Sequence, residues 1–264
     1  MPRKFTARFS QMVLAAGLAL AATSVDAASL TAVSGTWVST NDDDGIHRLN
    51  GLGTDYISWG APVTSRGQSG YEFQSATRSG GVEITAGTTF DAGTFIHHNR
   101  RIWSTGRHTN GETSSISGAR LRVDYALDFG DGELRRYSSV FDFLHDETSN
   151  FARTCANGAN WEGINARGCS DRITLARNDE LSDSFVIGDL EYQLDLTGLL
   201  GQTPFWTAEQ AENSLELQGM FTTSKVPPPP PPPVPVPLPA GGLLLLTALA
   251  GAGAIGRRAR RAGT

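Results

Sequence analysis

The stretch ARLRVDYALDF, residues 119–129, alternates apolar and polar side chains with a period of two residues. Successive side chains of a β-strand point to opposite faces, so this period predicts a strand with one buried face. The apolar positions are Ala119, Leu121, Val123, Tyr125, Leu127 and Phe129. Gly130-Asp131-Gly132 then supplies turn chemistry, and residues 137–144 form a second strand-like run. We therefore predict an antiparallel hairpin around this turn.

Shorter strand-like runs occur on both sides of this hairpin. They cover residues 36–39, 56–59, 71–74, 82–85, 93–97, 173–175, 185–187, 190–196 and 215–221. Gly, Asn and Asp separate these runs, as is typical of antiparallel all-β proteins. One helix is predicted over residues 207–213, where Thr207 and Gln210 have the spacing of a capping box. We expect one all-β domain over residues 28–225, an antiparallel β-sandwich that is jelly-roll-like.

The composition is that of a globular protein. The chain has 264 residues, of which 39% are hydrophobic, 19% are charged and 30 are glycine. Its long apolar stretches lie only at the two ends, which excludes a polytopic membrane protein. The formal net charge is −5, and Lys225 is the only lysine of the expected domain. Nucleic-acid binding depends on clustered lysine and arginine, so we expect no nucleic-acid partner.

Residues 1–27 have the pattern of a secretory signal peptide. A basic start at residues 3–8 precedes an apolar run at residues 12–22 and a small-residue exit at residues 25–27. The apolar run is short for a membrane span, so we expect cleavage and export, with a retained anchor as the alternative. The mature protein is then expected at the cell surface or outside the cell.

The chain ends in a proline-rich linker, residues 226–239, and a sorting or transmembrane segment, residues 240–264. The linker contains an unbroken proline run at residues 227–233, which predicts an extended, semi-rigid stalk. The segment that follows begins with a short apolar helix and ends in a cluster of arginines, which favour the cytoplasmic side of a membrane. We expect residues 240–256 to contact the inner membrane transiently, and a permanent anchor is the alternative.

A short motif joins the linker to the apolar segment. It consists of Val236, Pro237, Leu238, Pro239 and Ala240. Together with the apolar helix and the arginine-rich end, this motif resembles the VPLPA-CTERM sorting signal, a relative of the PEP-CTERM signals. The resemblance implies a partner, an exosortase-type transpeptidase, that cuts near the motif and transfers the body of the protein.

Cys155 and Cys169 are the only cysteines of the chain. In an exported protein we expect them to form one disulfide, because oxidising compartments favour that bond. The residues between them show no apolar period, which predicts a surface loop closed at its base.

Two histidine-containing segments are candidates for chemistry. His97 and His98 end one predicted strand, and His145 ends another, close to Glu147. Imidazole and carboxylate groups that meet in space can bind a metal ion or act as an acid and base pair. The alternative is a hydrogen-bond network that fixes two loops, and we favour it because buried polar groups are usually hydrogen-bonded.

These segments also carry a resemblance to a family. The matching stretches are GTFIHHN at residues 93–99, FDFLHDETSN at residues 141–150, LGTDYISWG at residues 52–60 and ISGARLRVDYALDFG at residues 116–130. In this order they resemble the THxN family of PEP-CTERM-type proteins and the related choice-of-anchor K domain. The motif residues are His97, Asn99, His145, Glu147 and Asn150, and Ile96 replaces the motif threonine. The resemblance implies an exported, surface-sorted β domain without an established activity, and therefore no catalytic residues.

Two further features are candidates for ligand binding. Asp42 and Asp44 lie in an acidic loop that could bind Ca²⁺ through carboxylate oxygens, although a solvated turn is the favoured interpretation. Trp161 lies among polar residues between the two cysteines, where it could stack on a sugar ring or fold back over the disulfide. The other tryptophans, Trp37, Trp59, Trp103 and Trp206, are expected in the core.

The sequence thus favours a protein that is not an enzyme. We expect a structural or interaction module of the cell surface or of an exopolysaccharide matrix, with no required cofactor. The alternatives are a calcium-dependent carbohydrate-binding module and a glycan-processing enzyme.

Overall fold

A computed structural model of the protein describes residues 28–41, 45–76, 81–149, 152–159, 161–196, 204–226 and Leu249. Several predicted features lie outside these residues, namely the signal peptide, Asp42, Asp44, Asn150 and the motif Val236, Pro237, Leu238, Pro239 and Ala240. The chain divides into two compact units, Met1–Val226 and Pro227–Thr264. Within the described residues, no helix is both long enough and apolar enough to cross a membrane.

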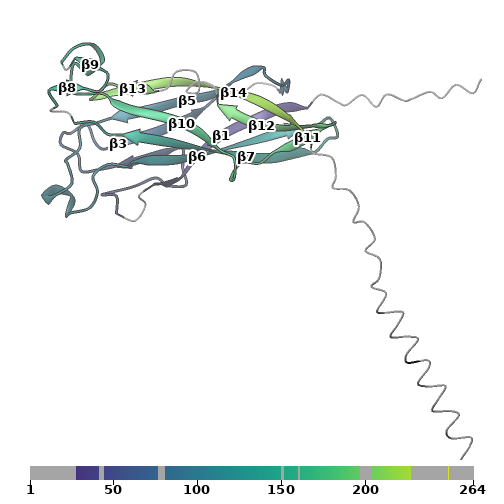
Figure 1. Ribbon diagram of the computed structural model, residues 1–264, viewed down its shortest axis with the longest axis horizontal. Helices are drawn as coiled ribbons and strands as arrows, with labels where there is room; N and C mark the ends of the chain where they lie inside the picture. Colours follow the sequence, from purple (N-terminus) through teal and green to yellow (C-terminus); the bar gives the residue numbers. More distant parts are fainter. Residues whose placement is uncertain are drawn as a thin grey trace, which may run out of the picture. The chain divides into compact units, whose positions relative to one another are not determined.

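The body is a sandwich of two antiparallel sheets, each with six strands over the described residues (Figure 1). The first sheet has the order β13 (Phe205–Thr207), β10 (Asp171–Asn178), β7 (Leu134–Asp146), β6 (Gly118–Asp128), β1 (Ser29–Thr40) and β4 (Val82–Glu83). The second has the order β11 (Phe185–Ile187), β12 (Leu190–Leu196), β14 (Ala211–Lys225), β5 (Thr89–Asn99), β3 (Ser69–Ser75) and β2 (Tyr56–Trp59). The predicted all-β sandwich is confirmed, with more strands than the eight of a jelly roll.

The predicted hairpin is also confirmed. Strands β6 and β7 pair antiparallel from Gly118 opposite Leu144 to Asp128 opposite Leu134. The apolar face of β6 is buried, and Leu121 is among the fully buried residues of the core. The alternating pattern therefore predicts both the strand and its buried face correctly. The burial of one face also fixes the register in which β6 pairs.

The core between the sheets is built mainly from aromatic side chains. Trp37 of β1 is fully buried, and its ring centroid lies 5.3 Å from that of Tyr71 and 5.1 Å from that of Phe143. Gly35, one inward position earlier on β1, leaves room for the ring of Phe73, which lies 2.3 Å from where a Cβ atom would stand. Packing across the two sheets thus depends on a large indole next to a position without a side chain.

The predicted helix at residues 207–213 is wrong. Thr207 pairs with Asp171 at the end of β13, and β14 begins at Ala211 opposite Asn99. Between these strands Gln210 has a φ angle of 54°, in the left-handed region, which no α-helix residue adopts. Pairing with distant strands overrides the local capping pattern here.

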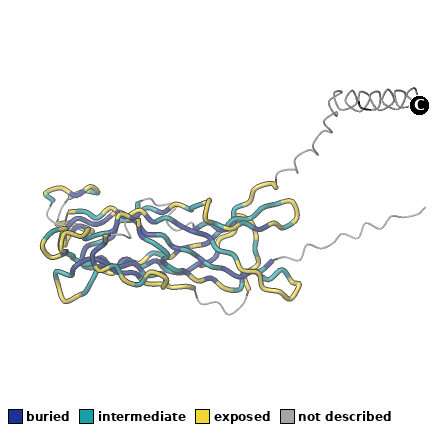
Figure 2. Tube along the Cα trace, turned by 90° about the horizontal axis from the view of Figure 1, so that it is seen from below, coloured by how far each residue is buried: buried dark blue, intermediate teal, exposed yellow. Residues whose placement is uncertain are grey.

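The two ends of the sandwich differ in the strand ends and loops that lie there. At one end, called the loop end, β5 and β7 finish at Asn99 and Asp146 and β14 begins at Ala211. This end lies at the left of Figure 1, where β8 (Thr154–Cys155) and β9 (Gly158–Ala159) form a small hairpin. At the opposite end β1 begins at Ser29 and β14 finishes at Lys225. Figure 2 shows buried residues along the strands and exposed residues in the loops at both ends.

Candidate functional site

At the loop end, the inward faces of several strands change from apolar to polar residues. On β5 the inward positions run from Phe95 to His97 and Asn99, and on β7 from Phe143 to His145. On β10 the first inward residue is Asp171. These polar side chains are buried although each sits in an apolar alternation. The strand period therefore directs them into the core, where each requires a hydrogen-bond partner or another ligand.

His97 is oriented by a hydroxyl group from the facing sheet. Its Nδ1 atom lies 2.8 Å from Oγ1 of Thr207, which itself donates to the carbonyl oxygen of Asp171 at 3.4 Å. Because this hydroxyl donates its own hydrogen onward, it accepts from His97, so Nδ1 carries the imidazole proton. Burial, together with the proximity of His145, holds the pKa of His97 well below its usual value, which keeps the ring neutral. Its Nε2 atom thus carries a lone pair and has no hydrogen-bond partner within the described part of the chain.

His145 meets His97 across the sandwich. The centroids of the two imidazole rings are 5.3 Å apart, so the two predicted histidine segments form one cluster. Nδ1 of His145 shares a hydrogen bond with the hydroxyl of Tyr71, and its Nε2 atom lies 3.3 Å from Oε2 of Glu147. That carboxylate oxygen also accepts a hydrogen bond of 2.9 Å from Ser115. His98, by contrast, pairs with Glu72 at 2.8 Å and does not join the cluster.

Asp171 is the carboxylate at the centre of the cluster. Its Oδ2 atom accepts a hydrogen bond of 2.8 Å from the amide of Asn99, and its Oδ1 atom accepts one of 2.8 Å from the backbone of Thr148. Burial raises the pKa of Asp171 well above its usual value, and the carboxylates of Glu147 and Glu209 add to the rise. Negative charge is therefore disfavoured at Asp171 unless a cation lies nearby.

Sequence reasoning missed several members of this cluster, namely Tyr71, Asp171, Thr207 and Glu209. Asp171 carries a signal in the sequence, because it precedes the apolar positions Ile173 and Leu175 at the same spacing of two. An acidic residue in the register of a buried strand face is rare unless it is paired.

Two overlapping sets of side chains have spacings suited to a metal ion. His97, His145 and Asp171 each offer one ligand atom, and these atoms lie within 4.8 Å of one another. The same holds for Glu147, Asp171 and Glu209. The first set combines imidazole and carboxylate groups, which is the donor set of zinc and related transition metals.

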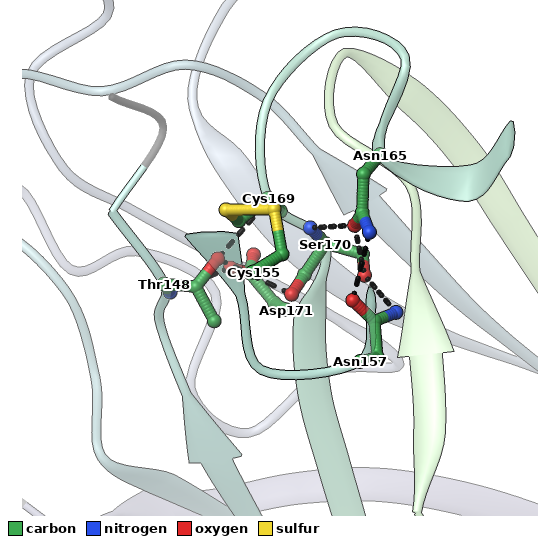
Figure 3. The surroundings of a disulfide bond; sticks show 7 residues. All are labelled: Thr148, Cys155, Asn157, Asn165, Cys169, Ser170 and Asp171. Atoms are coloured by element: carbon green, nitrogen blue, oxygen red, sulfur yellow. Dashed lines mark hydrogen bonds between the residues drawn. A yellow bond between two sulfur atoms is a disulfide. The ribbon is translucent and has the colours of Figure 1, made fainter. Parts of the chain in front are cut away.

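The disulfide supports the cluster from outside. Cys155 and Cys169 are bonded, which confirms the predicted pair, and their Cα atoms are 5.2 Å apart (Figure 3). The carbonyl oxygen of Cys169 accepts a hydrogen bond of 2.7 Å from the hydroxyl of Thr148, whose backbone binds Asp171. Within the loop, buried Asn165 accepts a hydrogen bond of 2.9 Å from the backbone of Ser170.

A cavity of about 660 Å³ lies beside the cluster. It is lined by Val63, Arg101, Ile102, Trp103, Ser104, Ser114, Glu147, Thr148 and Ser149. Glu147 thus faces the cavity and also contacts His145. The expected burial of Trp103 is wrong, because its side chain is 40% exposed in the loop that follows β5. Its ring instead stacks on that of His108, with centroids 4.1 Å apart.

The remaining tryptophans divide between the core and the surface. Trp37 and Trp59 are fully buried, as predicted, and Trp206 is only half-buried. Trp161 is 60% exposed, and its backbone φ is 66°.

Comparison with known proteins adds no family to this geometry, since no protein-family model matches the chain and no curated protein matches it significantly.

Proposed function

We propose that this protein is an exported, surface-sorted β-sandwich module that binds exopolysaccharide through its loop end and is not an enzyme. The VPLPA-type motif Val236, Pro237, Leu238, Pro239 and Ala240 supports sorting by an exosortase-type transpeptidase. In this proposal the apolar segment at residues 240–256 contacts the inner membrane only until that step.

The cavity beside Trp103 is the observation that carries the binding role. Exposed indole rings provide a rigid apolar face that suits stacking on a sugar ring, and nearby polar groups supply hydrogen bonds. Trp103 is held in place by a backbone hydrogen bond of 2.8 Å to Ala61 and by its stacking on His108. Arg101 and Glu147 supply charged polar groups on the cavity wall. Trp161, in the loop between β7 and β10, adds a second exposed indole at the same end.

The position of the chain ends supports the same role. The body starts at β1 and finishes at β14 on the end opposite the loop end. The described strands of the body therefore begin and end on the side away from Trp103. This arrangement favours display of the cavity to the surroundings of the cell.

The burial of the ionisable groups supports binding rather than catalysis. His97 and Asp171 are fully buried, whereas a catalytic acid or base must reach the substrate. Of the described residues that line the cavity, Glu147 is the one carboxylate. Glycoside hydrolysis in most families requires two carboxylates on opposite sides of the bond that is cleaved.

The Trp103→Ala variant tests this proposal. We expect it to weaken binding to exopolysaccharide purified from the exporting cells by about ten-fold or more, because it removes the aromatic surface of the cavity. Affinity electrophoresis of the full chain through gels containing that polysaccharide measures the effect. Tyr56→Ala is the matched control, since it removes an exposed aromatic ring outside the cavity. Equal retardation of all three proteins, or none of the unmodified chain, would contradict the proposal.

A further inference from the structure

The buried cluster holds more unused ligand atoms than a hydrogen-bond network needs. The Nε2 atom of His97 carries a lone pair with no partner within the described residues, and the side chain is fully buried. The Oδ1 atom of Asn99, whose amide nitrogen binds Asp171, is likewise buried without a described partner. Two acceptor atoms without donors in one core region are costly to leave unsatisfied, and a bound cation satisfies such atoms.

The distance between His145 and Glu147 is also compatible with two ligands of one metal ion. The Nε2 atom of His145 and Oε2 of Glu147 are 3.3 Å apart, which exceeds the usual range of about 2.7–3.2 Å for N–H···O bonds. Two ligand atoms at about 2.0–2.2 Å from one tetrahedral zinc ion lie about 3.4 Å from each other. One ring nitrogen of His97, one ring nitrogen of His145 and one carboxylate oxygen of Asp171 lie within 4.8 Å of one another, and Glu147 adjoins this set through His145 and Asp171.

Both imidazoles also have a hydrogen-bond partner at Nδ1, as metal-binding histidines usually do. Oγ1 of Thr207 accepts from Nδ1 of His97, and the oxygen of Tyr71 lies at Nδ1 of His145. Partners of this kind fix the ring and leave Nε2 for the metal. When a metal ion occupies Nε2 of His145, its Nδ1 carries the proton and donates to Tyr71.

We propose that His97, His145, Asp171 and Glu147 bind one divalent transition-metal ion of the Zn²⁺ type. His97 comes from one sheet, whereas His145 and Asp171 come from the other, so the ion joins the two sheets at the loop end. Four protein ligands make this a structural rather than a catalytic site. Glu147 lines the cavity, so the ion enters the site from the cavity. This inference does not require the proposed polysaccharide ligand, although Glu147 belongs both to the metal site and to the cavity wall.

Metal titration of the purified full chain tests the inference. After treatment with a chelator, the chain is titrated with Zn²⁺ or Ca²⁺ while thermal melting and metal content are measured. We expect about one zinc ion per chain and a melting temperature that rises with Zn²⁺, because a ligand of the folded state stabilises it. Ca²⁺ should have a much smaller effect. Absence of zinc binding, or a preference for Ca²⁺, would overturn the proposal.

Variants of single ligands locate the ion. We expect His97→Gln and Asp171→Asn to weaken zinc affinity by about ten-fold or more, since each removes a ligand. His98→Gln is the matched control, because His98 follows His97 on β5 but pairs with Glu72 outside the cluster. Unchanged affinity in a folded ligand variant, or loss in His98→Gln, would overturn the assignment. If the ligand variants fail to fold, X-ray absorption of the zinc-loaded unmodified chain must show imidazole scattering, and a spectrum without it refutes the site.

Discussion

Replacing Trp37 by alanine is expected to lower the free energy of unfolding by about 3–5 kcal/mol, the usual cost of truncating a buried aromatic side chain. The indole is fully buried and packs against the rings of Tyr71, Phe95 and Phe143. Its Nε1 atom also donates a hydrogen bond of 3.1 Å to the carbonyl oxygen of Asp55. The substitution thus creates a cavity between the sheets and leaves that carbonyl without this donor.

Urea unfolding of the full chain measures the effect of Trp37→Ala. Trp103→Ala is the control, because it makes the same chemical change at a half-exposed position and should cost less than about 1 kcal/mol. If the two variants lose equal stability, the aromatic core is not the main source of cohesion between the sheets.

Loss of the disulfide should have the second largest effect. For the double variant Cys155→Ser and Cys169→Ser, we expect a loss of about 3 kcal/mol, because the bond closes a loop with a sequence separation of 14 residues. The same loop holds the carbonyl oxygen of Cys169 against the hydroxyl of Thr148, beside Asp171. Some loosening of the buried cluster should therefore accompany the loss.

Chemical reduction provides the matched comparison for the disulfide. A reducing agent should lower the unfolding midpoint of the unmodified chain to that of the double variant, and it should leave the double variant unchanged. A midpoint that does not respond to reduction, while mass spectrometry shows free thiols, would rule out a stabilising role for this bond.

The strands were largely predictable because a half-buried sheet imposes a local period of two. Residues 119–129 show this period directly, and the structure places β6 there. Residues 207–213 could not be predicted, because their conformation depends on pairing with Asp171 and Asn99, which are distant in the sequence. Local helix signals contribute less free energy than two such strand pairings.

The site was only partly predictable for a similar reason. His97 and His145 stand out as histidines at strand ends, but the sequence does not reveal that their strands face each other. Asp171 and Thr207 join them because β13 pairs with β10, which is a property of the topology. Trp103 could not be placed either, since its exposure depends on where β5 ends. Individual candidate residues such as His97 and His145 could thus be predicted from the sequence, whereas their proximity in space could not.

We propose that the mature protein is an exported sandwich from which both ends of the chain have been removed. Intact-mass measurement of the protein recovered from the surface or medium of the exporting cells tests this proposal. We expect a species that begins near Ala28 and ends near the motif formed by residues 236–240. Recovery of the chain only from the cytosol, with both Met1 and Thr264 present, would contradict it.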